Sequence, residues 1–169
     1  MFPKNKIYIF SSLTEDKQLD EINKTRIKRI KLNEKFCSTP LTINDFKDCL
    51  ILYDDTETIT NPMLVEKLNN LKALIMTTGR HTGTFYVETS HLANGWKNRL
   101  ILAEAYSITL FLISMGAGSL FRFLDSAFVF SRDQIRRISA IKSRWVTIVR
   151  AQPIAVMHEH GMFHIHNEL

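Results

Sequence analysis

The feature that most constrains the fold is an apolar run that ends abruptly in two carboxylates, Cys49-Leu-Ile-Leu-Tyr-Asp-Asp55. A continuous apolar run of this length is typical of a strand buried on both faces, as in the centre of a parallel sheet. Ligands of such sheets bind at the carboxyl ends of the strands. The run therefore predicts a central parallel strand that presents Asp54 and Asp55 at a functional edge.

Strand-like and helix-like segments alternate on both sides of this run. Asn61 and Pro62 supply a cap and a first-turn proline for a helix that ends near Gly79. The other expected elements are strands over 6–10, 26–32, 84–89, 106–111, 144–150, 154–158 and 162–166, helices over 14–22 (with Thr14 as cap), 98–105, 119–128 and 131–141 (with Ser131 as cap), and a connection over 33–47. This alternation predicts an α/β fold, with a mostly parallel sheet flanked by helices and a C-terminal antiparallel β ribbon.

Length and composition fit one intracellular domain. The chain has 169 residues, of which 45% are apolar and 23% charged, and it can bury a core without disulfides or a metal. Its longest apolar stretch, 108–118, is about half of the ~20 residues that a membrane-spanning helix needs, and no signal-peptide pattern is present. Cys37 and Cys49 lack CxxC spacing and are expected to be reduced packing residues. We expect one domain over 1–169, in the cytosol and without a membrane partner.

The two carboxylates have two interpretations. An apolar strand that ends in paired acids resembles the Walker B element of P-loop NTPases. Asp54 would then hold Mg²⁺, and Asp55 would orient or deprotonate the attacking water. The same pattern also occurs where an ordinary strand passes into a turn.

The next predicted strand ends in three polar residues, Thr89, Ser90 and His91. Adjacent parallel strands would place these residues beside Asp54 and Asp55, where they could reach a γ-phosphate or its attacking water. Alternatively, they only begin a loop. The sequence thus predicts Thr89 and Ser90 as candidate nucleotide-binding residues.

Several motifs in a fixed order resemble one family. They are Leu50-Ile-Leu-Tyr-Asp-Asp55, Thr78-Gly-Arg-His81, Thr89-Ser-His91, Asn98-Arg99 with Glu104-Ala105, Ser143-Arg-Trp-Val146 and Gln152-Pro153. This order resembles the genome-packaging ATPases of large DNA viruses, which belong to the FtsK/HerA superfamily, and the resemblance covers nearly the whole chain. It implies a P-loop α/β core that forms a ring, commonly a hexamer, and pumps double-stranded DNA with energy from ATP.

The resemblance also implies roles for single residues. Asp54 would bind Mg²⁺ and Asp55 would act on the attacking water. His91 occupies the polar sensor position that many relatives fill with Gln. Arg80 and Arg99 are candidates for phosphate contact, within a subunit or as an arginine finger across a ring interface. Such an arginine is worth about 10³–10⁵ in rate in enzymes that use one.

One element of the family, the Walker A motif, is missing from this sequence. None of the six glycines is followed by lysine, although a P-loop needs Gly-Lys-Ser/Thr to hold the phosphates. The implied core would also lack a strand that in relatives lies beside the Asp-Asp strand. We therefore expect no hydrolysis by this chain alone, and we expect activity only with a complementing ATPase fragment.

The implied partners are double-stranded DNA, further copies of the chain or the complementing fragment, and a capsid component, in the host cytoplasm (viral factory) or the virion. The alternative is a non-catalytic module, derived from such an ATPase, that binds DNA or the capsid. A net charge of +5 is compatible with an anionic partner, although clusters of basic residues are more often solvated faces. The two clusters are Lys24, Arg26, Lys28, Arg29 and Lys31, and Arg132, Arg136, Arg137, Lys142, Arg144 and Arg150.

The C-terminal segment is rich in histidine. Paired strands could bring His158, His160, His164 and His166 onto one face, where a divalent metal could bind. Histidines two positions apart on exposed strands are, however, often without a metal, and no cysteine supports the cluster.

Overall fold

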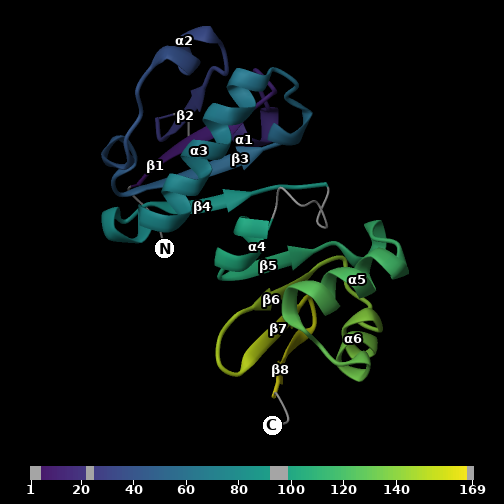
Figure 1. Cartoon of the computed structure of the whole chain (residues 1–169). Coiled ribbons are helices and arrows are strands. Elements are labelled where there is room, and N and C mark those ends of the chain that lie inside the picture. The colour runs from purple at the N-terminus through teal and green to yellow at the C-terminus, as the bar shows by residue number, and fades with distance from the viewer. Residues whose placement is uncertain (1–4, 22–24, 92–98, 167–169) are drawn as a thin grey trace. The chain divides into compact units, whose positions relative to one another are not determined.

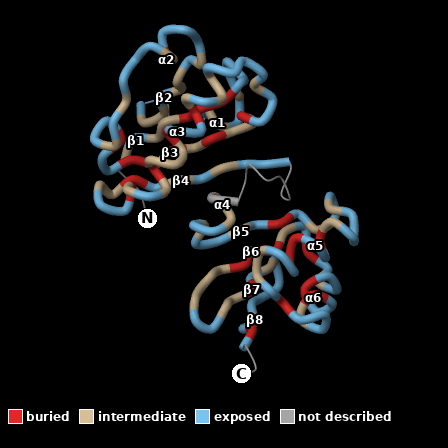
Figure 2. Tube along the Cα trace, in the orientation of Figure 1, coloured by how far each residue is buried: buried red, intermediate tan, exposed pale blue. Residues whose placement is uncertain are grey.

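The computed structural model describes residues 5–21, 25–91 and 99–166, and it divides the chain into two compact units, Met1–His91 and Leu92–Leu169. Each unit has its own four-stranded sheet and its own buried core (Figures 1 and 2). The sequence predicted one domain over 1–169. Because the structure shows two compact units, each is described by itself below.

The sheet of the first unit is entirely parallel. Its strands lie in the order β2 (Ile27–Ile30), β1 (Lys6–Ser11), β3 (Cys49–Asp54) and β4 (Phe85–Glu88). The apolar run therefore forms the central strand β3, as predicted. The expectation that β3 would lack a neighbour is wrong, because β1 and β4 pair with it on either side. Among the described strands, the edges of this sheet are β2 and β4.

Helix α3 (Pro62–Thr78) covers one face of this sheet (Figure 1). The helix begins as predicted: Pro62 is in its first turn, and the Asn61 side chain accepts hydrogen bonds from two backbone N–H groups. The buried core between helix and sheet consists of Phe10, Phe36, Phe46, Cys49, Ile51, Tyr53, Leu68, Leu71 and Ile75. Alternate residues of β3 thus face α3, which fixes the strand's orientation.

Two further predictions about the first unit were wrong. Residues 33–47 are not a plain connection, because they contain helix α2 (Glu34–Ser38) and the 3₁₀ helix η1 (Ile43–Phe46), which bury Phe36 and Phe46. Helix α1 (Lys17–Glu21) is shorter than expected. Its cap is the Asp16 side chain, which accepts from two backbone N–H groups, and not Thr14.

The sheet of the second unit is antiparallel. It contains β5 (Ser107–Leu110), β6 (Val146–Val149), β7 (Ile154–His158) and β8 (Gly161–Ile165) in chain order. The ribbon β6–β8 is as predicted. The mostly parallel sheet is confirmed only for the first unit, because β5 pairs antiparallel with β6. The chain is therefore α/β, with one parallel and one antiparallel sheet.

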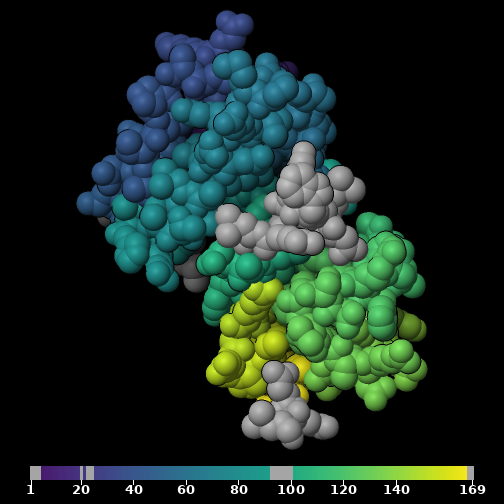
Figure 3. Space-filling model, in the orientation of Figure 1, coloured from purple at the N-terminus to yellow at the C-terminus, as the bar shows by residue number. Residues whose placement is uncertain are grey.

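Helices α5 (Ala117–Phe128) and α6 (Arg132–Ser139) cover one face of the antiparallel sheet. The residues buried between them include Phe123, Leu124, Ile138, Ile148 and Val156. Atoms of the yellow C-terminal strands lie directly against the green helical region in the space-filling view (Figure 3). Helix α6 begins with the predicted Ser131 cap. This unit also contains α4 (Arg99–Glu104) and the 3₁₀ helix η5 (Leu112–Ser114).

None of the helices within the described ranges has the length and apolar character needed to cross a membrane.

The C-terminal histidines do not share one face. His164 lies opposite Ala155 in the register, and His158 lies opposite Gly161. Because side chains alternate along a strand and His158 is three positions from Ala155, His158 and His164 point to opposite faces of the sheet. His164 and His166 form one ring contact and His158 and His160 another. No group of three metal-ligating side chains exists among the described residues. The prediction that all four histidines share one face is therefore wrong.

Glu159, in the turn between β7 and β8, holds the segment that leads into β6. Its carboxylate accepts hydrogen bonds from the Arg144 backbone N–H (2.8 Å), from Arg144 Nε (2.7 Å) and from Ser143 Oγ (3.1 Å). The backbone N–H of Arg144, followed by its side chain, lowers the pKa of Glu159 to about 2. Glu159 therefore stays ionised and keeps Arg144 engaged at neutral pH.

Val129 has a strained backbone at the end of α5. Its φ of 56° and ψ of 37° are left-handed, a region that β-branched residues rarely adopt, and its side chain is largely exposed. Glycine adopts this conformation without steric cost.

We expect Val129→Gly to raise the free energy of unfolding of the second unit by about 1 kcal/mol. A urea titration followed by tryptophan fluorescence measures the change, because Trp96 and Trp145 both belong to this unit's sequence. Val129→Ala should give a smaller gain, and an unchanged midpoint for Val129→Gly would contradict the strain.

Candidate functional site

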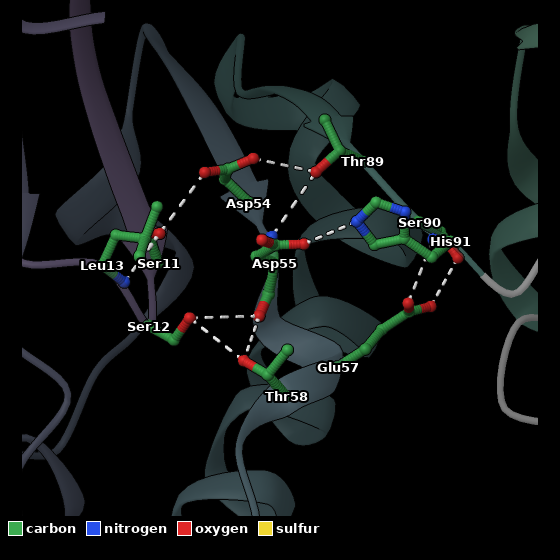
Figure 4. Close-up of polar contacts among 10 residues, drawn as sticks. All are labelled: Ser11, Ser12, Leu13, Asp54, Asp55, Glu57, Thr58, Thr89, Ser90 and His91. Carbon is green, nitrogen blue, oxygen red and sulfur yellow. Dashed lines mark hydrogen bonds and ion pairs between the residues drawn. The ribbon is translucent and has the colours of Figure 1, made fainter. Parts of the chain in front are cut away.

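The polar residues predicted at two strand ends meet at the carboxyl edge of the parallel sheet (Figure 4). In the register, Ser11 of β1 lies beside Asp54, and Glu88, the last residue of β4, lies beside Tyr53. Thr89 follows Glu88, and its backbone N–H donates to the Tyr53 carbonyl at 3.0 Å. The ladder between β3 and β4 therefore brings Thr89 to Asp54, as predicted.

Two hydroxyl groups orient the carboxylate of Asp54. Thr89 Oγ1 donates to Oδ1 at 2.9 Å, and Ser11 Oγ lies 3.4 Å from Oδ2. Ser11 is itself buried, and its Oγ accepts from the Leu13 backbone N–H at 3.1 Å. Each carboxylate oxygen can accept more than one hydrogen bond or ligand. Asp54 is thus held in place while keeping capacity for a cation or its water.

Asp55 lies at a sharp turn out of the strand. Its φ of 51° is left-handed, a conformation that Asp tolerates better than most residues. The turn aims its side chain toward His91, whose Nε2 lies 3.0 Å from Oδ1. Asp55 is 36% exposed and His91 81%. Both side chains are therefore accessible to a ligand or a water molecule.

Glu57 is a site residue that sequence reasoning missed. It lies in the 3₁₀ helix η2 (Thr56–Thr58), directly after Asp55. Its carboxylate accepts from Ser90 Oγ at 2.5 Å and from the His91 backbone N–H at 3.0 Å (Figure 4). These bonds hold the segment after β4 against the Asp55 turn. The only signal in the sequence was a third carboxylate two positions after the pair.

Two further hydroxyls brace the Asp55 turn. Thr58 Oγ1 donates to the Asp55 carbonyl at 2.9 Å, and Ser12 Oγ lies 3.4 Å from the same oxygen. Ser12 and Thr58 also lie within 3.1 Å of each other. Residues after β1 and in η2 thus fix the backbone of the turn.

Of the two candidate arginines, Arg80 is not brought to this edge. Arg80 lies in the 3₁₀ helix η3 (Gly79–Thr82), which precedes β4 and therefore lies at the amino end of the parallel strands. A hydrogen bond from the Asp48 backbone N–H to the Thr82 carbonyl confirms this position, because Asp48 precedes β3. Within the first unit, Arg80 is thus about a strand length from Asp54. Arg99 begins α4 in the second unit, and its side chain lies outside the described residues.

The arrangement suits a weakly chelated cation. No cluster of three metal-ligating side chains is found among the described residues, so a dedicated protein cage is not formed there. Mg²⁺ in nucleotide enzymes is usually held by one or two carboxylates, with water and substrate phosphates completing its shell. Asp54, oriented by two hydroxyls, fits the first of these roles.

Comparisons with known proteins found one viral relative. Uncharacterized protein V3 of the Sputnik virophage is 35% identical over 164 residues, which cover 95% of this chain and 65% of that protein. The chain therefore spans somewhat less than two thirds of the length of the relative that it matches. No protein-family model and no solved structure matches the sequence.

Proposed function

We propose that the chain is part of a viral DNA-packaging ATPase of the FtsK/HerA superfamily and carries the Mg²⁺-binding and water-activating half of its active site. The observation that carries this proposal is the hydrogen-bonded group of Asp54, Asp55, Thr89 and His91 at the carboxyl edge of a parallel sheet. Two acids at the end of a central strand, beside polar groups after the neighbouring strand, correspond to the Mg²⁺-binding and water-orienting part of a P-loop NTPase site. A virophage relative supports a viral role.

Each residue has a proposed role. Asp54 holds Mg²⁺, and Asp55 orients the attacking water and accepts its proton. His91 fixes Asp55 and senses the γ-phosphate, while Thr89 and Ser90 line the nucleotide side of the edge. Charge that develops on the transferred phosphoryl group still needs a cation. Because Arg80 lies at the far end of its own sheet, it could act only from a neighbouring subunit.

The phosphate cradle must come from a polypeptide segment outside these 169 residues, on the same or another chain. A strand that carried it could extend the parallel sheet at β4. Among the described strands, β4 is an edge of this sheet, and the backbone groups of an edge strand can pair with a further strand. The assembled enzyme would move double-stranded DNA into a capsid, in the host cytoplasm or the virion.

A complementation assay tests this function. The isolated chain should neither bind nor hydrolyse ATP, because the element that holds the triphosphate is missing. Adding a strand–loop–helix fragment with Gly-Lys-Ser/Thr from a packaging ATPase should restore Mg²⁺-dependent hydrolysis. A fragment with Gly-Lys changed to Gly-Ala is the matched control. Robust hydrolysis by the isolated chain, or none with the fragment, would contradict the proposal.

A non-catalytic DNA- or capsid-binding module is the second candidate. It is favoured by helix α6, where Arg132 and Arg136 are exposed and Arg136 is paired with Asp133. The guanidinium of Arg137 on the same helix lies 3.9 Å from the centre of the Phe163 ring, and Arg137 is exposed. The contact with the ring fixes the direction of this side chain at the surface. Binding of DNA or of a capsid component through these arginines does not require Asp54 or Asp55.

DNA binding through α6 has a salt signature. Each phosphate that a side chain neutralises contributes about 0.9 to the slope of log affinity against log salt. Arg132→Gln should therefore reduce that slope by about 1, as measured by fluorescence anisotropy with duplex DNA at several salt concentrations. Arg80→Gln, which removes an equal charge from the first unit, is the control. Equal slopes for Arg132→Gln and the unchanged protein would exclude Arg132 as a phosphate contact.

A further inference from the structure

A largely buried ion pair lies beneath the carboxyl edge of the parallel sheet. Lys72 of α3 and Glu88 of β4 are 13% and 4% exposed, and Lys72 Nζ lies 2.5 Å from Glu88 Oε1. The Tyr86 hydroxyl donates to the other carboxylate oxygen. Burial, followed by the charge of Glu88, raises the pKa of Tyr86, which keeps its phenol protonated as a donor. Both oxygens of Glu88 are therefore engaged.

Lys72 also contacts the turn that carries the acids. Its Nζ donates to Thr56 Oγ1 at 3.3 Å and lies 4.9 Å from the centre of the Tyr53 ring. Thr56 is buried and directly follows Asp55, whereas Glu88 directly precedes Thr89. One ammonium group thus joins the residues that flank the two sides of the candidate site.

Stability alone does not account for this pair. A buried ion pair is often no more stabilising than apolar residues of similar volume. Groups behind a metal ligand have a different effect, because removing the partners that orient a ligand typically lowers metal affinity 10–100-fold. Lys72 acts one step further back, because it contacts Thr56, which follows Asp55, and Glu88, which precedes the Thr89 that donates to Asp54.

Building on the proposed function, we propose that Lys72 is a positioning residue for the cation site. Together with Glu88 and Thr56, it fixes the spacing between the acidic turn and the segment after β4. This spacing allows Thr89 to donate to Asp54 and His91 to reach Asp55. Lys72 therefore sets the affinity of the edge for a divalent cation without touching the cation.

The test is a titration of the full chain with Mn²⁺, followed by electron paramagnetic resonance, alongside the free energy of unfolding. The double variant Lys72→Met, Glu88→Gln removes one positive and one negative charge, so the net charge stays at +5. We expect it to bind Mn²⁺ about 10-fold more weakly. Thr56→Val removes only the hydroxyl that Lys72 contacts and keeps the ion pair, so it should lose less Mn²⁺ affinity. If the double variant does not fold, Thr56→Val tests the role of Lys72.

Two controls separate positioning from the site itself. Asp133→Asn with Arg136→Met neutralises an exposed ion pair on α6 and should leave Mn²⁺ affinity unchanged. Asp54→Asn should abolish the binding. Suppose that the double variant and Thr56→Val bind Mn²⁺ as tightly as the unchanged protein, whereas Asp54→Asn loses the binding. This result would overturn the role of Lys72 and leave the proposed function standing. Unchanged affinity in Asp54→Asn would overturn the metal role of Asp54, and this inference with it.

Discussion

Replacing Asp55 with Asn is expected to lower the rate of ATP hydrolysis by the complemented protein about 10²–10⁴-fold, the usual contribution of a general base. The amide has the same size but cannot accept the proton of the attacking water. Asn tolerates the left-handed backbone of this turn as Asp does, so the fold should be retained. Binding of MgATP should also be retained, because Asp54 and its two hydroxyl partners are unchanged.

The measurement compares steady-state hydrolysis with equilibrium binding of MgATP. Asp54→Asn should weaken the Mg²⁺-dependent binding itself, which separates the roles of the two acids. Asp48→Asn is the matched control. Asp48 has nearly the same backbone φ (52°) as Asp55, but it precedes β3 at the opposite end of the sheet. Full hydrolysis by Asp55→Asn would exclude Asp55 as the group that activates water.

Replacing Lys72 alone with Met is expected to lower the free energy of unfolding of the first unit by about 3–5 kcal/mol, because it leaves the charge of Glu88 buried without its partner. Glu88 is only 4% exposed, so solvent cannot replace the lost ammonium group. Adding Glu88→Gln should recover most of the loss. The Tyr86 hydroxyl can still donate to the amide oxygen, and no charge remains buried.

A urea titration monitored by far-UV circular dichroism measures this loss, with hydrogen exchange at the amides of β3 and β4 locating it. Both tryptophans belong to the sequence of the second unit, so their fluorescence should keep its midpoint. If Lys72→Met is as stable as the unchanged protein, the Glu88 carboxylate is not buried away from water in the way the structure indicates. A double variant as unstable as the single one would assign the loss to packing of the Lys72 side chain.

Local patterns predicted the elements that carry strong local signals. The apolar run became the central strand β3, Asn61 and Pro62 began α3, and Ser131 began α6. Each of these signals acts within a few residues, through burial or capping, and needs no distant partner. Phe36 and Phe46 had no such pattern, because single aromatic side chains in a polar stretch become buried only when the neighbouring sheet is present.

Long-range pairing was only partly predictable. The meeting of Thr89 with Asp54 followed from the rule that adjacent parallel strands end at the same edge. The pairing of β5 with β6 did not follow from any local pattern, because a short strand carries no mark of parallel or antiparallel partners. Glu57 was missed for a similar reason, since its role depends on Ser90, 33 residues away.

The sequence by itself determined that this protein has a buried strand ending in Asp54 and Asp55, because that pattern depends only on the order of apolar and acidic residues. The tertiary structure decided which groups serve those acids. Thr89 and Ser11 reach Asp54 and His91 reaches Asp55, while Lys72 with Glu88 lies beneath them and Arg80 stays at the far end of the sheet. These placements depend on strand order and register, which arise from contacts between distant parts of the chain.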